Sequence, residues 1–270
     1  MKKNNPYLTI INANTKYNEE DFRDLQFSQI EVAKGDRGKT ASFIETNTRN
    51  AFEKAVQELQ SLNIPSTLNS AGRDFEDQQY AITEFYKKEL SENGNDEAKA
   101  RKETDEYCAK VGFSEHHSGL ALDIIGATGN AIIPDKIKEK YSDKKYAKSL
   151  GFITKRLVME KYGFILTYPT SSRLEQATGM KHPEGWHWRY VGPEHSQMIA
   201  RIREHLTEDI DERKSDETII FQEVFLEDYV QLLQYKINAS NEEELVKQYV
   251  ELFKTEILGI KQQNKEQISL

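Results

Sequence analysis

One aspartate inside an apolar run constrains the fold of this chain more than any other feature of the sequence. The segment 119–125 reads Gly-Leu-Ala-Leu-Asp-Ile-Ile, which is typical of a buried β-strand. Side chains alternate along a strand, so Ala121 and Asp123 share one face while Leu120 and Leu122 share the other. Because burying a lone carboxylate costs free energy, Asp123 must bind a metal ion, pair with an arginine or cap a turn.

All six histidines lie between residues 116 and 205, which concentrates the possible metal ligands in the middle of the chain. In the segment 186–191, Trp-His-Trp-Arg-Tyr-Val, strand alternation places His187 and Arg189 on one side and the aromatic side chains on the other. Glu184 lies shortly before His187, in a turn between Pro183 and Gly185. Catalytic zinc takes three ligands from His and carboxylates and leaves a position for water. The two clusters therefore contain the residue types that a zinc hydrolase needs.

Composition excludes several classes of protein. Cys108 is the only cysteine, so the chain has no intrachain disulfide and no thiolate-based metal site of its own. The formal charge of −8 argues against a nucleic-acid partner. No run of about twenty apolar residues predicts a transmembrane segment, and the run 8–11 is too short for a signal peptide. We therefore expect a soluble, cytoplasmic protein; if an export signal had been removed, the chain would belong to the cell envelope.

Short strand-type segments alternate with helix-type segments along the chain. Besides 119–125, strands are expected at 7–12, 66–69, 164–168 and 186–191. Helices are expected at 48–62, through 86–90, and at 96–110, 146–162, 196–205, 224–233 and 242–260, with a break at 93–95. Residues 126–130 and 170–178 are expected to be loops, and 206–217 an exposed acidic connector. The last helix either covers the core, as most amphipathic helices do, or forms a docking or dimer surface; the oligomeric state is left open.

Four sequence blocks resemble one family. The string 114–123, Ser-Glu-His-His-Ser-Gly-Leu-Ala-Leu-Asp, fills every fixed position of the SxHxxGxAxD signature of the zinc D-Ala-D-Ala peptidases: VanY carboxypeptidases, VanX dipeptidases, bifunctional VanXY enzymes and LD-carboxypeptidases. Residues 70–78 look like the family's SGYRSYxxQ block, 162–169 resemble YGFxxxYP, and 184–192 are similar to EPWHxRYVG. The His-x6-Asp spacing alone is common, and a helical HExxH motif is absent, so the ordered blocks carry the resemblance.

The resemblance implies an α+β fold in which helices flank a small antiparallel sheet, as in Hedgehog-like domains and DD-peptidases. It covers roughly residues 7–233, so we expect a catalytic domain over 1–235 and a C-terminal helical extension over 236–270. Carried over position by position, it implies Zn²⁺ as cofactor and seven site residues. These are the zinc ligands His116, Asp123 and His187, the general base Glu184, Arg73 for the oxyanion or substrate carbonyl, and Ser114 and Gln78 for substrate binding.

Two departures from the family pattern bear on the substrate rather than on the ligands. Gly185 replaces the usual proline after Glu184, which leaves φ free there, and Gly72 replaces an aromatic residue before Arg73. Histidines 117, 182, 195 and 205 are expected at the surface or behind the site, and Cys108 is interpreted as a small structural residue.

The expected substrate is a peptidoglycan stem peptide or another small peptide ending in D-Ala, from which the enzyme would remove the C-terminal D-amino acid. A DD-dipeptidase and an LD-carboxypeptidase of the same family are alternatives. The VanY-type blocks favour a carboxypeptidase with room for a longer chain, whereas the lack of an export signal favours a VanXY-like enzyme. A Hedgehog-like zinc-containing binding module is the alternative from another class; Glu184 and Arg73 argue against it because function follows the site rather than the fold.

Overall fold

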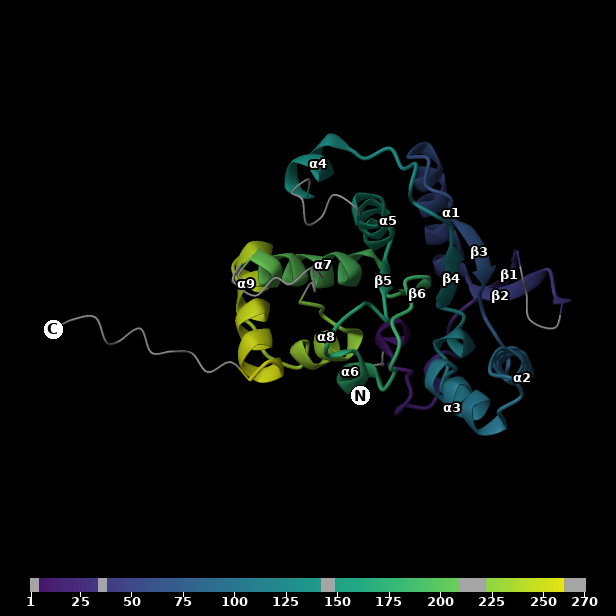
Figure 1. Ribbon diagram of the computed structural model, residues 1–270. Helices are drawn as coiled ribbons and strands as arrows, with labels where there is room; N and C mark the ends of the chain where they lie inside the picture. The colour runs from purple at the N-terminus through teal and green to yellow at the C-terminus, as the bar shows by residue number, and fades with distance from the viewer. Residues whose placement is uncertain (1–4, 34–37, 142–148, 209–221, 260–270) are drawn as a thin grey trace.

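The fold is organised around a four-stranded antiparallel sheet in the order β3-β4-β6-β5 (Figure 1). The computed structural model describes residues 5–33, 38–141, 149–208 and 222–259. The strands of the sheet are β3 (Thr67–Ser70), β4 (Ala121–Ile125), β5 (Phe164–Leu166) and β6 (His187–Tyr190). Helices flank this small sheet, so the predicted α+β class is confirmed.

The register of the two central strands determines which side chains face the candidate site. Along β4 and β6, Leu122 pairs with Trp188 and Asp123 pairs with His187. Leu122 and Trp188 are fully buried in the main hydrophobic core. Because neighbouring positions of a strand point to opposite faces, Asp123 and His187 project from the other face. The alternation predicted for both strands is confirmed.

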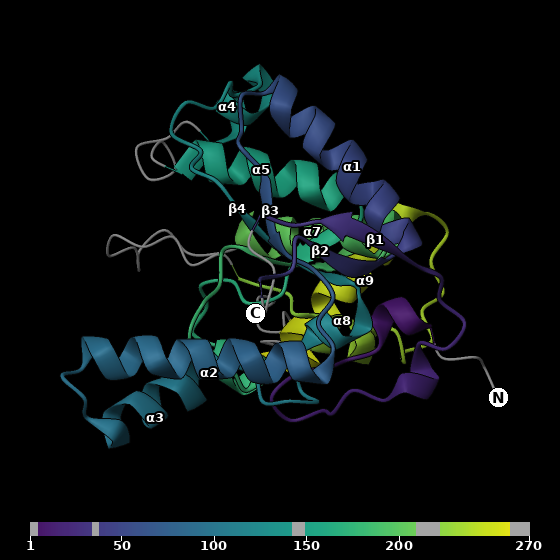
Figure 2. The same cartoon turned by 90° about the vertical axis from the view of Figure 1, so that its right-hand side faces the viewer.

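Helices α1 (Thr46–Ser61) and α5 (Leu150–Lys161) cover the core face of the sheet and pack on each other (Figure 2). In α1 the apolar side chains recur at helical spacing, and Phe52 and Leu59 are buried in the main core. Glu45 caps the helix because its carboxylate accepts hydrogen bonds from the first free backbone N–H groups, at 2.7 and 2.9 Å. The predicted helix 48–62 is confirmed.

Two consecutive helices, α2 (Phe75–Glu92) and α3 (Glu97–Tyr107), lie on the other side of the sheet from α1 and α5 (Figure 2). Asp74 caps α2 by accepting a hydrogen bond from the backbone N–H of Asp77 at 2.7 Å. The two helices pack on each other, and the chain turns between them where Gly94 has a φ of 65°. The break predicted at 93–95 is confirmed. We call α2 and α3 together the helical hairpin.

A further layer of helices lies beyond the β5 edge of the sheet (Figure 1). It contains α7 (Pro193–Glu208), α8 (Leu226–Leu232) and α9 (Glu242–Leu252), which is followed by a π-helical turn, Phe253–Ile257. The inward side chains of α9 are buried in a second hydrophobic core together with residues of α7, α8 and β5. The last helix therefore covers the core, which is the first of the two alternatives that the sequence left open. The domain boundary near residue 235 stays a prediction, and most of the expected connector 206–217 lies outside the described residues.

Two predictions of local structure are wrong. Residues 7–12 do not form a strand, because Pro6 begins a 3₁₀ helix, Pro6–Leu8, and the side chain of Asn12 closes a turn by accepting from backbone N–H groups at 2.9 and 3.0 Å. The expected loop 170–178 contains the short helix α6 (Leu174–Thr178), because Leu174 is buried in a small apolar cluster there.

Several elements were not predicted, among them β1 (Phe27–Glu31), β2 (Ala41–Glu45) and α4 (Asp135–Tyr141). Strands β1 and β2 form an antiparallel pair beside the main sheet. The remaining short elements are η2 (Glu19–Asp21) and η4 (Glu115–Ser118). Within the described ranges, no helix combines the length and the apolar character needed to cross a bilayer.

Candidate metal centre and active site

All seven residues that the sequence predicted for the site line a single pocket. The pocket has a volume of about 530 Å³, and residues of the sheet and of the helical hairpin line it. The predicted residues come from three separate segments of the chain, 73–78, 114–123 and 184–187, which the fold brings together. They are Arg73, Gln78, Ser114, His116, Asp123, Glu184 and His187.

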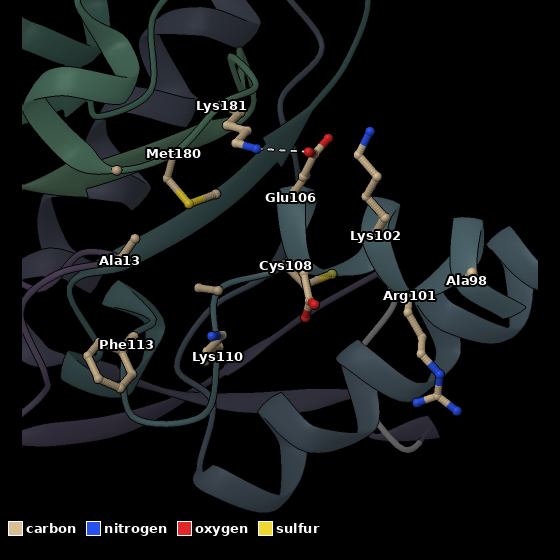
Figure 3. A pocket seen from close by; sticks show the side chains of 13 residues that line it. Ala13, Ala98, Arg101, Lys102, Glu106, Cys108, Lys110, Phe113, Met180 and Lys181 are labelled. Carbon is tan, nitrogen blue, oxygen red and sulfur yellow. Dashed lines mark hydrogen bonds and ion pairs between the residues drawn. The ribbon is translucent and has the colours of Figure 1, made fainter.

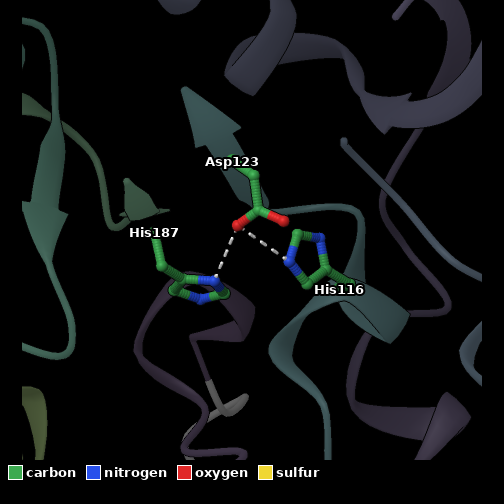
Figure 4. Close-up of side chains that lie close together, drawn as sticks. All are labelled: His116, Asp123 and His187. Atoms are coloured by element: carbon green, nitrogen blue, oxygen red, sulfur yellow. Dashed lines mark hydrogen bonds and ion pairs between the residues drawn. The ribbon is translucent and has the colours of Figure 1, made fainter. Parts of the chain in front are cut away.

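Three buried side chains at the base of the pocket point their donor atoms toward one another (Figure 4). His116 belongs to η4, Asp123 to β4 and His187 to β6. Asp123 Oδ1 is 3.3 Å from His116 Nε2 and 3.2 Å from His187 Nδ1. One ligand atom from each residue falls in a set whose members are all within 4.8 Å of one another. Two imidazole nitrogens and one carboxylate oxygen are the donor set of a catalytic zinc site.

The backbone that carries His116 depends on a left-handed glycine. Gly119 ends η4 with a φ of 68°, and the chain then enters β4. A Cβ at this position would lie 2.9 Å from the ring of Phe27. Glycine therefore allows the sharp turn that sets His116 opposite Asp123.

Each imidazole is oriented by a hydrogen bond at its other ring nitrogen. His116 Nδ1 lies 2.5 Å from the carbonyl oxygen of Ala71, which can only accept, so this nitrogen carries the proton. His187 Nε2 lies 2.9 Å from a carboxylate oxygen of Glu115. Both arrangements leave the nitrogen that faces Asp123 available to a metal ion. The residues present therefore fit a zinc ion.

Glu115 is a part of the site to which the sequence analysis assigned no role. The residue is 2 % exposed, and besides His187 it contacts the guanidinium of Arg189 at 3.4 Å. Although burial raises it, the hydrogen bond from His187 and the charge of Arg189 hold the pKa of Glu115 below its ordinary value. Two sequence signals pointed here: a carboxylate directly before His116, and Arg189 on the same strand face as His187.

The electrostatic environments of the two histidines differ. Burial, with the Arg73 charge nearby, lowers the pKa of His116 to about 4. Burial alone would also lower the pKa of His187, but its hydrogen bonds to Asp123 and Glu115 raise it to about 10. Asp123 is desolvated as well, yet its contacts with the two histidines and with Arg73 hold its pKa well below the ordinary value.

Glu184 lies beside the three candidate ligands on a tight turn. Its backbone N–H donates to the carbonyl of Tyr168 at 2.8 Å, and its own carbonyl accepts from the backbone N–H of His187 at 3.2 Å. These bonds hold the backbone on both sides of Gly185. The carboxylate lies 3.8 Å from His187 Nδ1, and burial raises the pKa of Glu184 to about 7.

Arg73 reaches the site from the segment before α2 and is fixed at several points. Its Nη2 donates to Asp123 Oδ2 at 2.8 Å, its Nη1 to Gln78 Oε1 at 3.2 Å and its Nε to Ser70 Oγ at 3.0 Å. The amide of Gln78 in turn donates to the carbonyl of Ala109 at 2.8 Å. Gln78 therefore orients Arg73 and also lines the pocket, while its predicted role in substrate binding stays a prediction. Ser114 lines the same pocket at the start of η4.

The other histidines and Cys108 agree with their sequence interpretation. His117 is buried behind the site, where its ring contacts the backbone of Arg73 at 2.8 Å. His182 stacks on the ring of Tyr107 at 3.7 Å. Burial raises the pKa of the Cys108 thiol to about 12, so no thiolate forms near neutral pH.

Two curated proteins are similar to part of this chain. A D-alanyl-D-alanine carboxypeptidase of Enterococcus faecium is 34% identical over 114 residues, which cover 42% of this chain and 32% of that protein. The bifunctional D-Ala-D-Ala dipeptidase and carboxypeptidase VanXYC of Enterococcus gallinarum is 37% identical over 97 residues, which cover 36% of this chain and 46% of that protein. The matches thus span less than half the length of these two relatives.

Comparison with solved structures agrees on the fold. The D,D-pentapeptidase VanY of a VanB-type resistance cassette, solved with Zn(II), aligns with a TM-score of 0.52 at 20% identity, covering 72% of this chain and 93% of that one. The D,D-dipeptidase VanXYg, solved with a D-Ala-D-Ala phosphinate analogue, aligns with a TM-score of 0.50 at 22% identity, covering 87% and 77%. The sequence profile of the VanY family, described as D-alanyl-D-alanine carboxypeptidase, matches residues 41–193, which include every predicted site residue. The chain therefore belongs to the VanY family of D-alanyl-D-alanine carboxypeptidases.

Proposed function

We propose that this protein is a zinc-dependent carboxypeptidase that removes the C-terminal D-amino acid from peptides of the bacterial cell wall or their precursors. The observation that carries the proposal is the convergence of His116, Asp123 and His187, with Glu184 beside them in one pocket. Membership of the VanY family supports the same activity.

The residues of the pocket divide the work as follows. His116, Asp123 and His187 would hold the zinc ion, which when bound lowers the pKa of water and polarises a carbonyl group. Glu184 accepts the proton of the attacking water and passes it to the leaving amine, because its carboxylate lines the pocket beside the candidate ligands without being one of them. Arg73 donates to the carbonyl oxygen as negative charge develops there.

The size of the pocket favours a substrate longer than a dipeptide. Its volume of about 530 Å³ is that of a site for a drug-sized molecule, and its walls extend along α2 and α3 well beyond the metal cluster. A pentapeptide stem is therefore the preferred substrate class. A D-Ala-D-Ala dipeptidase and an LD-carboxypeptidase are the alternatives within the family, and the substrate panel below separates them.

The test is to incubate the zinc-loaded protein with D-Ala-D-Ala, a pentapeptide stem and a tetrapeptide stem, and to identify released D-Ala by mass spectrometry. We expect release from the pentapeptide. Release from the dipeptide alone would indicate a dipeptidase, and release from the tetrapeptide alone an LD-carboxypeptidase. Glu184→Gln is the control, expected to abolish release while zinc stays bound. If no peptide is cleaved by the zinc-loaded protein, the proposal fails and a zinc-containing binding module is favoured.

A further inference from the structure

A second pocket, of about 570 Å³, lies beside the catalytic pocket and shares part of its wall (Figure 3). Cys108, Ala109 and Met180 line both pockets. A peptide bound with its C-terminus at the metal cluster can therefore extend over these three residues into the second pocket. We call it the basic pocket, because of the charges described below.

The basic pocket is built from the end of α3 on one side and the segment 179–181 on the other. Two contacts join these walls. Lys181 Nζ pairs with Glu106 Oε1 at 2.8 Å, as Figure 3 shows, and the ring of His182 stacks on that of Tyr107 at 3.7 Å and 4°. The segment 179–181 continues directly to Glu184, so this wall of the pocket and the turn that carries Glu184 belong to one stretch of chain.

The lining is cationic in a chain whose net charge is −8. The lining contains four basic side chains and two carboxylates. The basic residues are Arg101, Lys102, Lys110 and Lys181, and the acidic ones are Asp105 and Glu106. Lys181 is neutralised by Glu106, but Lys102 and Lys110 are exposed and form no ion pair with any residue in the described part of the chain. The catalytic pocket next to it has the opposite bias, with five carboxylates against two basic side chains.

We propose that the basic pocket binds the side-chain carboxylates of an acidic peptide substrate, on the N-terminal side of the bond that is cleaved. This inference rests on the proposed function, because it assigns the catalytic pocket to the C-terminal residue. Lys102 and Lys110 supply the charges that are free to meet the peptide. The catalytic residues thus select the D-amino-acid end, and the basic pocket selects the acidic part of the chain that precedes it.

The test measures binding without turnover. A fluorescent peptide that ends in D-Ala-D-Ala and carries glutamate residues before them is titrated with the zinc-loaded Glu184→Gln protein, and the anisotropy is recorded. A matched peptide carries glutamine in place of glutamate. We expect the acidic peptide to bind more tightly than the neutral one. The further double change Lys102→Gln with Lys110→Gln is expected to weaken binding of the acidic peptide about three- to tenfold, because exposed charge pairs each contribute little. Binding of the neutral peptide should not change.

The control removes the same charge elsewhere on the hairpin. Lys87→Gln with Lys99→Gln, at positions that line neither pocket, is expected to leave both affinities unchanged. Equal weakening of both peptides, or no change for the acidic one, overturns the assignment of the basic pocket. Hydrolysis of D-Ala-D-Ala-terminated peptides by the protein with native Glu184 reports on the proposed function separately. If the protein cleaves these peptides but does not bind the acidic one more tightly, this inference is wrong and the proposed function stands. If it binds the acidic peptide more tightly but cleaves neither, the proposed function is wrong and the assignment of the basic pocket stands.

Discussion

Two carboxylates hold one imidazole from opposite ends at the candidate metal centre. Asp123 contacts His187 Nδ1 at 3.2 Å, and Glu115 contacts its Nε2 at 2.9 Å. The second contact fixes which nitrogen carries the proton and how the ring is turned, which is the usual role of a carboxylate behind a metal-binding histidine. Arg189 balances the charge of Glu115 in a place that water does not reach.

The first prediction concerns Glu115→Gln. The amide keeps a similar shape but loses the negative charge, so it holds the His187 ring less firmly and leaves Arg189 without its counter-charge. We expect zinc affinity to fall by about ten- to a hundredfold, measured by competition with a chromophoric chelator. Glu103→Gln, in the same pocket but without contact to His187, is the control and is expected to keep the native affinity. Equal affinities for Glu115→Gln and the native protein would show that Glu115 does not position the ligand.

A third carboxyl, that of Glu227, interacts electrostatically with Tyr168 and Arg189, which both also interact with Glu115. Glu227 in α8 accepts a hydrogen bond from Asn12 at 2.7 Å through Oε1, while its Oε2 is shielded from solvent and has no hydrogen-bond partner in the described residues. Burial, with the charges of Glu115 and Asp228 nearby, raises the pKa of Glu227 to about 7. The fold therefore favours the protonated form.

The second prediction is a pH dependence of stability caused by Glu227. Its pKa is raised from 4.5 to about 7 on folding, so the folded state binds the extra proton between these values. The contribution is favourable below pH 4.5 and is lost as pH rises through 7. Native protein and Glu227→Gln are compared by urea unfolding at several pH values. We expect the native protein to lose on the order of 1–2 kcal/mol relative to the variant between pH 5 and 8. If the free energy of unfolding depends on pH in the same way for the native protein and for Glu227→Gln, Glu227 does not take up a proton on folding.

At the scale of elements, the β1–β2 pair accounts for one departure from the family pattern. Gly72 stands where the family's block has an aromatic residue, and its backbone N–H donates to the carbonyl of Phe43 in β2 at 2.9 Å. A Cβ on Gly72 would lie 2.4 Å from that carbonyl oxygen and 2.5 Å from the Phe43 ring. The ring of Phe43 thus occupies the space into which a side chain at position 72 would extend.

The third prediction compares two glycines near the site. Gly72→Ala is expected to destabilise the protein by about 1–3 kcal/mol and to disturb the adjacent Arg73, because the added carbon overpacks the contact with β2. Gly185→Ala is the matched change: the nearest atom to its Cβ would be in Phe152 at 3.7 Å, an ordinary contact. We expect Gly185→Ala to be neutral or stabilising by up to about 1 kcal/mol, through a less flexible unfolded chain. Equal losses of stability in the two variants, measured by thermal unfolding, would contradict the packing described.

The elements that the sequence predicted are those whose own pattern is strong. The core faces of α1, β4 and β6 follow from apolar periodicity, and the break at Gly94 follows from turn chemistry. The β1–β2 pair was missed because the two apolar residues of β1, Phe27 and Ile30, do not follow the strand period, and because the pair depends on contacts with distant residues such as Gly72. Segment 7–12 was assigned to a strand on its apolar pattern alone. Pro6 and Asn12 prevent the strand through local hydrogen bonds, which this pattern does not reveal.

For the site as well, the sequence predicts what a local pattern specifies and misses what depends on long-range packing. The family blocks identify the seven predicted residues in the sequence, and all seven line one pocket in the structure. The partners that orient them, such as Glu115 for His187 and Gln78 for Arg73, depend on how separate segments pack, and a single sequence gives little information on that.

At the scale of the whole molecule, the C-terminal helices form a second core beside the catalytic one. Ile165 of β5 and Phe253 after α9 belong to this core, and Arg156 of α5 pairs with Glu223 before α8 at 2.7 Å. These contacts attach the last helices to the sheet that carries the ligands. The C-terminal region is thus part of the scaffold, at least as far as residue 259.

The fourth prediction tests this scaffold role. Phe253 is fully buried, and Phe253→Ala leaves a cavity far from the metal cluster. We expect a loss of about 3–5 kcal/mol in the free energy of unfolding, with the zinc affinity of the remaining folded protein unchanged. A loss below about 1 kcal/mol in denaturant unfolding would instead indicate that the last helix is only loosely attached.

The central claim is that His116, Asp123 and His187 form one zinc site that serves peptide hydrolysis. It is tested most directly by adding zinc in steps to metal-free protein and measuring the rate of D-Ala release from a pentapeptide ending in D-Ala-D-Ala. The account predicts a rate that rises linearly and saturates at one equivalent of zinc, and no rate at any zinc concentration for Asp123→Ala. Release that does not depend on zinc, or a protein that binds one equivalent and releases nothing, would contradict it.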